Sequence, residues 1–151
     1  MGRITIFLLE ERIANEVNNM TTWLISANAN MYDHSAAFAK WGFVDWMQFA
    51  NYEVGDIVYI YASKQEGVIK YKTIVTKNNM NISEIEEDDS FWHDTRDLRR
   101  REMKYSRLKL VKRLDNNRLK LSFLREHGLK NAPQRAKKLD GELLEYIQSQ
   151  E

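Results

Sequence analysis

Three charged residues in the second half of the chain have the types needed for metal-dependent cleavage of a phosphodiester. Asp97 is followed by Glu102 and Lys104, as in nuclease centres where carboxylates hold a metal ion. The surrounding segment is so rich in charge that this pattern arises easily by chance. A solvated charged face is therefore the favoured interpretation, and we predict no catalytic residue, no metal and no cofactor.

Other catalytic signatures are missing from the sequence. His34, His93 and His127 lack the spacing of metal ligands. The sequence contains no HExxH motif, nucleophile elbow, P-loop or dinucleotide-binding glycine motif. It also contains no cysteine, which removes thiolate chemistry and fits a reducing compartment. The sequence therefore gives no argument for catalysis.

Aromatic side chains are the better candidates for a functional site. The large rings are spread over several segments: Trp23, Trp46, Tyr59, Tyr61 and Trp92. Most large rings lie in a core, but a ring can also stack on a nucleic-acid base while polar groups read the edge of the base. Trp46 is the best candidate for stacking, because Asp45 and Gln48 flank it in a segment without helical or strand periodicity.

Charge is segregated along the second half of the chain. Residues 84–97 include seven acidic residues and one arginine, whereas residues 96–113 include nine basic and two acidic ones. The basic residues could follow a phosphate backbone, or the acidic stretch could neutralise them by local pairing. We predict phosphate contacts for six of them: Arg99, Arg100, Arg101, Lys104, Arg107 and Lys109. The formal net charge of +1 gives no overall attraction to nucleic acid, so this patch must supply it.

The composition is that of one globular domain. The chain has 151 residues, of which 43% are hydrophobic and 30% charged. A chain of this length can bury roughly two-thirds of its unfolded surface. No apolar run approaches the roughly 20 residues of a membrane span. We therefore expect a cytoplasmic protein that makes no contact with a membrane.

The sequence predicts strands in four apolar or alternating runs, at 21–27, 57–62, 68–76 and 107–114. A short turn containing Gly67 joins the second and third of these strands as a hairpin. Leucines alternate with basic residues in the fourth, which indicates a half-buried strand with a cationic outer face. Residues 43–53 have no clear period and are expected to form a long loop.

Short helices are expected around this sheet. Asp33 can cap a helix that ends at Gly42, and two further helices are expected at 122–127 and 140–148. Residues 1–19 are predicted to be an N-terminal extension, although they could also form a short helix of their own. The remaining residues, 20–151, are predicted to be one α+β domain with a central sheet.

Several short motifs carry a resemblance to a known family. They include WLISAN at 23–28, Asp45-Trp46, VGDIVYIY at 54–61 and GELL at 141–144. No single motif is diagnostic, but their order and spacing between Met20 and Ile147 resemble the EVE domain family. The resemblance implies a PUA-like fold, a small curved β-barrel with short flanking helices, related to YTH and ASCH modules. It also implies a reader of modified bases in DNA or RNA.

The resemblance places six residues around the ligand pocket of such a domain: Ser26, Ala27, Asn28, Trp46, Gln48 and Tyr61. Small side chains at the end of the first strand would make space, and the Asn28 amide would read polar edges. The sequence departs from the family at Met47, where many relatives have Arg, and at 135–136, where many have Gly-Pro. Ligand identity is therefore less transferable than the fold.

The favoured hypothesis is a non-catalytic module that recognises a modified base of DNA or RNA in an aromatic-lined pocket. Two alternatives stay open. One is a metal-dependent nuclease, or another nucleic-acid enzyme, that uses the acidic residues of 94–104. The other is a protein-interaction module with a vestigial pocket.

Overall fold

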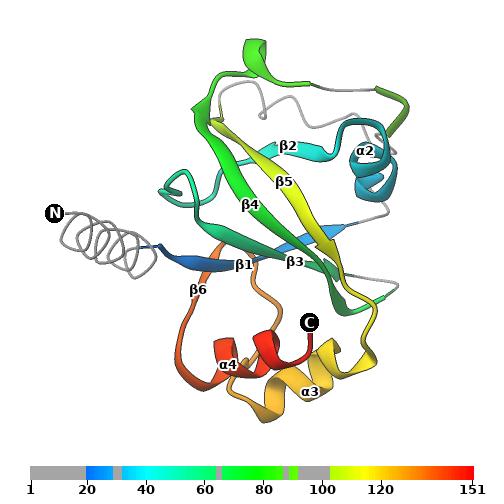
Figure 1. The fold of residues 1–151 in the computed structure, drawn as a ribbon, viewed down its shortest axis with the longest axis vertical. Coiled ribbons are helices and arrows are strands. Elements are labelled where there is room, and N and C mark those ends of the chain that lie inside the picture. Colours follow the sequence, from blue (N-terminus) through cyan, green and yellow to red (C-terminus); the bar gives the residue numbers. More distant parts are fainter. Residues whose placement is uncertain (1–19, 29–31, 64–65, 87–88, 92–102) are drawn as a thin grey trace, which may run out of the picture.

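A computed structural model describes residues 20–28, 32–63, 66–86, 89–91 and 103–151. In these ranges six strands form one curved sheet in the order β2-β5-β4-β3-β1-β6 (Figure 1). The predicted α+β class is confirmed. The predicted closure into a barrel is not observed in the described residues, because β2 and β6 are separate edges of an open sheet.

The strands are β1 (Thr22–Asn28), β2 (Phe43–Met47), β3 (Ile57–Ser63), β4 (Val68–Met80), β5 (Tyr105–Arg113) and β6 (Lys137–Leu139). β1 and β3 are parallel, whereas β4 is antiparallel to both β3 and β5. The four predicted strands and the hairpin at Gly67 are thus confirmed. β4 extends four residues beyond the predicted end at residue 76, to Met80.

The prediction of a long loop after Gly42 is wrong for Phe43–Met47, which is strand β2. This strand pairs with β5 and places Asp45 opposite Arg107. Val44, Asp45 and Trp46 are all buried, so both faces of the strand are covered. A strand buried on both faces lacks the alternation that identifies a half-buried strand, and this explains the error.

The described helices are α2 (His34–Trp41), α3 (Leu121–Glu126) and α4 (Gly141–Ser149). The ends of α2 are those that the sequence predicts. The Asp33 carboxylate accepts a hydrogen bond from the Ala36 amide at 2.9 Å, and Gly42 ends the helix with a φ of 77°. Glycine adopts this left-handed conformation without steric cost. None of the described helices is long and apolar enough to cross a lipid bilayer.

Two apolar clusters cover the two faces of the sheet. On one face Ile25 and Ile60 pack with Phe38 of α2. On the other face Leu24 and Tyr59 pack with leucines and Ile147 from α3 and α4. Side chains that are neighbours along a strand point to opposite faces. This alternation decides which of the predicted site residues can lie together.

Candidate functional site

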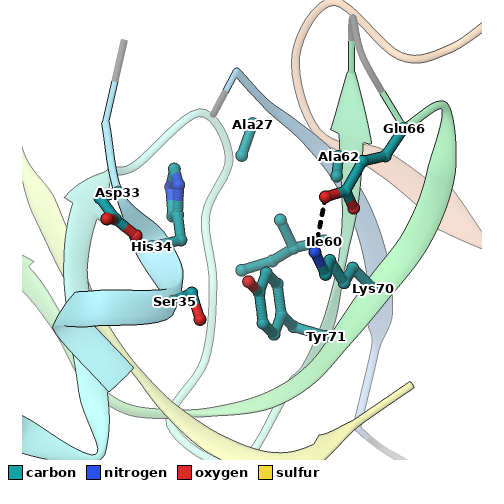
Figure 2. Close-up of a pocket in the computed structure, with 9 residues that line it drawn as sticks. All are labelled: Ala27, Asp33, His34, Ser35, Ile60, Ala62, Glu66, Lys70 and Tyr71. Carbon is teal, nitrogen blue, oxygen red and sulfur yellow. Dashed lines mark hydrogen bonds and ion pairs between the residues drawn. The ribbon is translucent and has the colours of Figure 1, made fainter. Parts of the chain in front are cut away.

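A cavity of about 250 Å³ lies between the start of α2 and strands β1, β3 and β4 (Figure 2). Its apolar wall consists of Ala27, Ile60, Ala62 and Tyr71. Ala27 and Ala62 are paired in register near the carboxyl ends of the parallel strands β1 and β3. Because both side chains are single methyl groups, the sheet leaves space at this point.

The first turn of α2 supplies the polar side of the cavity, through Asp33, His34 and Ser35. Arg113 of β5 holds this turn, because its guanidinium donates to the hydroxyl and the carbonyl of Ser35 at 3.0 and 3.2 Å. The same guanidinium lies 5.8 Å from the Tyr71 ring. Figure 2 shows the Tyr71 hydroxyl directed toward α2. A flat apolar surface and hydrogen-bonding groups therefore face each other.

An exposed ion pair lies at the rim of the cavity. Lys70 Nζ is 2.7 Å from Glu66 Oε1, and the two side chains are 37% and 40% exposed (Figure 2). Charges this accessible are screened by water and bind each other weakly. They are therefore available to a charged ligand.

His34 is buried between the cavity and a group of aromatic rings. Its Nδ1 lies 3.1 Å from the Tyr32 carbonyl oxygen, which makes Nδ1 the protonated nitrogen. Its Nε2 has no hydrogen-bond partner among the described residues. Burial lowers the pKa of His34 to about 4, against the opposing effects of the Tyr32 carbonyl and the Asp33 charge. The imidazole is therefore neutral at pH 7.

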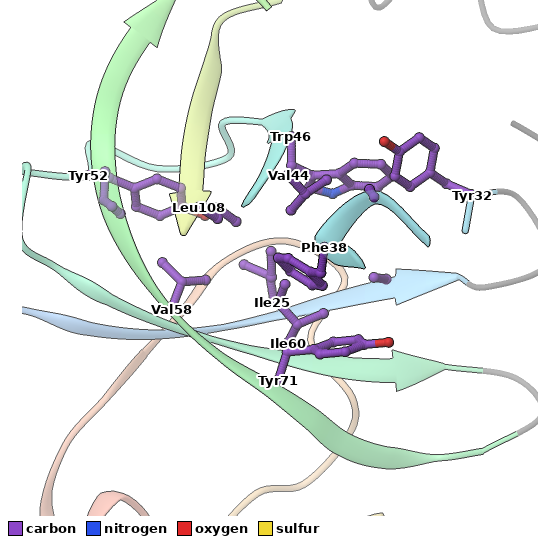
Figure 3. Packing of buried hydrophobic residues seen from close by; sticks show 13 residues of the cluster. Ile25, Tyr32, Phe38, Val44, Trp46, Tyr52, Val58, Ile60, Tyr71 and Leu108 are labelled. Atoms are coloured by element: carbon purple, nitrogen blue, oxygen red, sulfur yellow. The ribbon is translucent and has the colours of Figure 1, made fainter. Parts of the chain in front are cut away.

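Trp46 lies behind His34 and is 8% exposed. The centre of its ring is 4.5 Å from that of His34. It is 5.2 Å from the centre of the Tyr32 ring, which lies beside Trp46 in Figure 3. The prediction of an accessible ring on a loop is corrected here, because pairing of β2 with β5 turns the Trp46 side chain into the core. Trp46 supports the wall of the cavity but is not among the residues that line it.

Three other predicted pocket residues lie on the opposite face of the sheet. The Ser26 hydroxyl donates to the Pro133 carbonyl at 2.6 Å. Tyr61, paired in register with Ser26, belongs to the cluster under α3 and α4. Asn28 is two residues after Ser26 on β1, which gives it the same side of an extended strand. The structure therefore does not bring these three residues together with Trp46.

Gln48 follows β2 and pairs with Asn79 through two hydrogen bonds of 2.9 Å. It lies outside the cavity lining. Of the six residues predicted to bind the ligand, Ala27 is the one that lines this cavity.

The predicted phosphate contacts also separate. Arg107 donates from Nε and Nη2 to the two carboxylate oxygens of Asp45, both at 2.9 Å. Its guanidinium lies 4.0 Å from the Phe43 ring, and the hydrogen bonds to Asp45 raise its pKa. The Asp45 side chain is 0% exposed, so this bidentate pair is part of the fold. Arg107 is therefore already engaged with Asp45, and a phosphate contact by this residue stays a prediction.

Lys104 is exposed just before β5, and Lys109 is exposed on β5 itself. Lys104 Nζ donates to Asn81 Oδ1 at 2.6 Å. The other predicted contacts, Arg99 to Arg101, lie outside the described residues, as do Asp97 and Glu102 of the possible nuclease pattern. Within the described part of the chain, no group of three His, Asp or Glu side chains is placed to hold a metal ion.

The sequence reasoning missed most of the cavity. Asp33 was assigned only as a helix cap, and the hairpin residues Glu66, Lys70 and Tyr71 were not assigned to a site. A usable signal existed in the strand register. Once β1 and β3 are paired, the small residues Ala27 and Ala62 fall side by side.

Comparison with known proteins gives the fold. No protein-family model matches the chain, and no curated protein matches it. A hypothetical protein from Leishmania major is similar in structure, with a TM-score of 0.60 at 16% identity, over 87% of this chain and 94% of that one. A protein from Pseudomonas putida matches with a TM-score of 0.59 at 15% identity, over 85% and 97% of the two chains.

The ASCH protein from Zymomonas mobilis is also similar, with a TM-score of 0.57 at 13% identity, over 85% of this chain and 94% of that one. These likenesses extend over most of each chain. The chain therefore has a fold similar to that of ASCH domains, which is a PUA-like fold.

Proposed function

We propose that this protein is a nucleic-acid-binding module that takes one unstacked base, carrying a modification, into the cavity between α2 and β4. This proposal keeps the function that the resemblance to EVE domains implies, and it includes membership of the EVE family. It moves the ligand from the surroundings of Trp46 to the other side of His34.

The observation that carries the proposal is the division of the cavity into one flat apolar side and one polar side. A base has apolar faces and polar edges, and proteins bind unstacked bases by covering the faces and hydrogen-bonding the edges. Ile60 and Tyr71 offer the apolar surface, and Asp33 and Ser35 offer polar atoms. The volume of about 250 Å³ is below the roughly 300–1,000 Å³ of drug-sized sites, which favours a single ring system.

The small residues of the wall favour a modified base. Ala27 and Ala62 stand together where larger side chains would fill the cavity. A methyl group added to a base would occupy this space and bury apolar surface, which contributes about 0.8 kcal/mol for each buried carbon. Unstacking the base costs a few kcal/mol, so contacts of this kind are needed to offset it.

Phosphate contacts would come from basic groups near the cavity. Lys70 lies at its rim, and Arg113 binds Ser35 of its wall. The exposed Lys104 and Lys109 stay predicted contacts along β5, with Arg99 to Arg101 as further ones. No overall charge attracts the nucleic acid, so affinity should depend on these local groups and fall with salt.

Fluorescence anisotropy with short single-stranded RNA and DNA, each with and without one methylated base, tests the proposal. The measurements are made in EDTA, and the length of each strand is checked afterwards. Binding with intact strands is the expected result. Cleavage that appears when EDTA is replaced by magnesium would favour the nuclease alternative, and absence of binding to every strand would refute the proposal.

Ala62→Leu places a larger side chain in the cavity and should abolish binding. Ala39→Leu is the matched control, because it makes the same change on the exposed side of α2. Melting temperatures of both variants show whether they fold. Since overpacking can destabilise a core, Ala27→Val provides a smaller obstruction. Equal affinities for wild type, Ala62→Leu and Ala27→Val would place the ligand elsewhere.

A further inference from the structure

A second hollow of about 350 Å³ adjoins the cavity, because Glu66 and Lys70 line both. Its other polar walls come from the segment after β5, through Asp115 and Asn117, and from Lys120 at the start of α3. The side chains of these three residues are exposed. The two hollows therefore share part of their lining, and the two together are called the groove.

One ion pair separates the two hollows. Lys70 Nζ and Glu66 Oε1 are 2.7 Å apart, and both side chains are more than one-third exposed. Pairs of this kind contribute little to stability, because water competes for both charges. A phosphate group can therefore replace the Glu66 carboxylate as the partner of Lys70.

The second hollow has polar side chains available for a ligand. Among the described residues, Asp115, Asn117 and Lys120 make no side-chain hydrogen bond, whereas the neighbouring Asn116 amide is engaged with Gln150. A carboxylate, an amide and an ammonium group together can both donate to and accept from the edge of a base.

We infer that the groove binds two successive nucleotides of a single strand. One base enters the cavity beside Tyr71, the next nucleotide occupies the hollow at Asn117 and Lys120, and the phosphate that links them lies on Lys70 in place of Glu66. The inference rests on the proposed function for the first nucleotide. It adds a second subsite and a negatively charged side chain that competes with the phosphate.

Isothermal titration of the full chain with a nucleoside, its mononucleotide and the corresponding dinucleotide tests the inference. The dinucleotide should bind several-fold more tightly than the mononucleotide. If nucleoside and dinucleotide bind equally well, the second subsite is refuted and the proposed function stands. If the nucleoside and both nucleotides fail to bind, the proposed function falls, and this inference falls with it.

Single substitutions then locate the phosphate. Lys70→Gln should weaken dinucleotide binding and reduce the magnitude of its salt slope by about 0.7, the value for one phosphate contact of a single strand. Glu66→Gln should tighten dinucleotide binding, because it removes the carboxylate that competes with the phosphate for Lys70. Lys138→Gln is the control, since it removes an exposed lysine from the edge strand β6.

Lys120→Gln should weaken the dinucleotide without affecting the nucleoside. These residues are exposed, so the variants are expected to fold, and circular dichroism checks this. Salt slopes that are equal for wild type, Lys70→Gln and Lys138→Gln would overturn the placement of the phosphate. If Lys120→Gln weakens nucleoside binding as much as dinucleotide binding, the division into two subsites is overturned.

Discussion

Lowering the pH should destabilise this protein through one buried imidazole. Burial lowers the pKa of His34 from its usual 6.5 to about 4. Between these values the unfolded chain binds more protons than the folded one, so the free energy of unfolding decreases as the pH falls from 6.5 to 4. The protonated ring would also bury a second N–H at Nε2, which has no partner among the described residues. The difference between the two pKa values corresponds to a loss of roughly 3 kcal/mol at pH 4.

Urea denaturation between pH 7 and pH 4 measures this loss. His34→Asn is the informative variant, because its amide can still donate near the Nδ1 position but takes up no proton in this range. Other titrating groups are present in both proteins, so the difference between their unfolding free energies isolates His34. Wild type should lose roughly 3 kcal/mol more than the variant. His127→Asn makes the same change outside the aromatic cluster, and equal pH dependence of wild type and His34→Asn would refute the reasoning.

Three further predictions concern stability. Arg107→Ala should lower the free energy of unfolding by about 3–5 kcal/mol, because it leaves the buried Asp45 carboxylate unpaired. An unchanged urea midpoint together with weaker nucleic-acid binding would instead show that Arg107 contacts phosphate. Trp46→Ala should lower the free energy of unfolding by roughly 3–5 kcal/mol, because Trp46 is a buried core residue. A stable Trp46→Ala variant that fails to bind nucleic acid would show instead that Trp46 stacks on the bound base. A chain that starts at Met20 should melt within a few degrees of the full chain, whereas a loss of several kcal/mol would show that residues 1–19 belong to the core.

The elements that sequence reasoning predicted correctly are those with local causes. A capping carboxylate at Asp33 and a left-handed glycine at Gly42 define α2, and both signals lie within the segment itself. Strand β2 has no such signal. Its Asp45 is buried because Arg107, 62 residues later, supplies the opposite charge. A contact at that separation is invisible to the analysis of any short window.

The cavity was missed for the same physical reason. Its walls come from three strands, the first turn of α2 and the turn before β4. None of these elements can be recognised as part of a site from its own sequence. The resemblance to EVE domains placed the ligand at the end of β1, where Ala27 lines the cavity. It selected Trp46 for stacking, but whether a ring is accessible depends on its neighbours, and here Tyr32 and His34 cover it.

The alternation of side chains along β1 decides which of the predicted residues can line one pocket. Ser26 and Ala27 are adjacent, so their side chains point to opposite faces of the sheet. Ala27 pairs with Ala62 beside α2, whereas Ser26 pairs with Tyr61 and bonds to the Pro133 carbonyl. A pocket on one face therefore excludes the residues of the other.

Ser26→Ala should thus act on stability and not on binding. Loss of the hydrogen bond to the Pro133 carbonyl should lower the free energy of unfolding by about 1 kcal/mol, the usual contribution of such a bond. Affinity for a single-stranded oligonucleotide should match that of wild type, because the hydroxyl lies across the sheet from the cavity. Ala27→Val, one residue away, should instead weaken binding of the oligonucleotide. If Ser26→Ala weakens binding and leaves the urea midpoint unchanged, the ligand lies on the face covered by α3 and α4, and the cavity beside α2 is not the site.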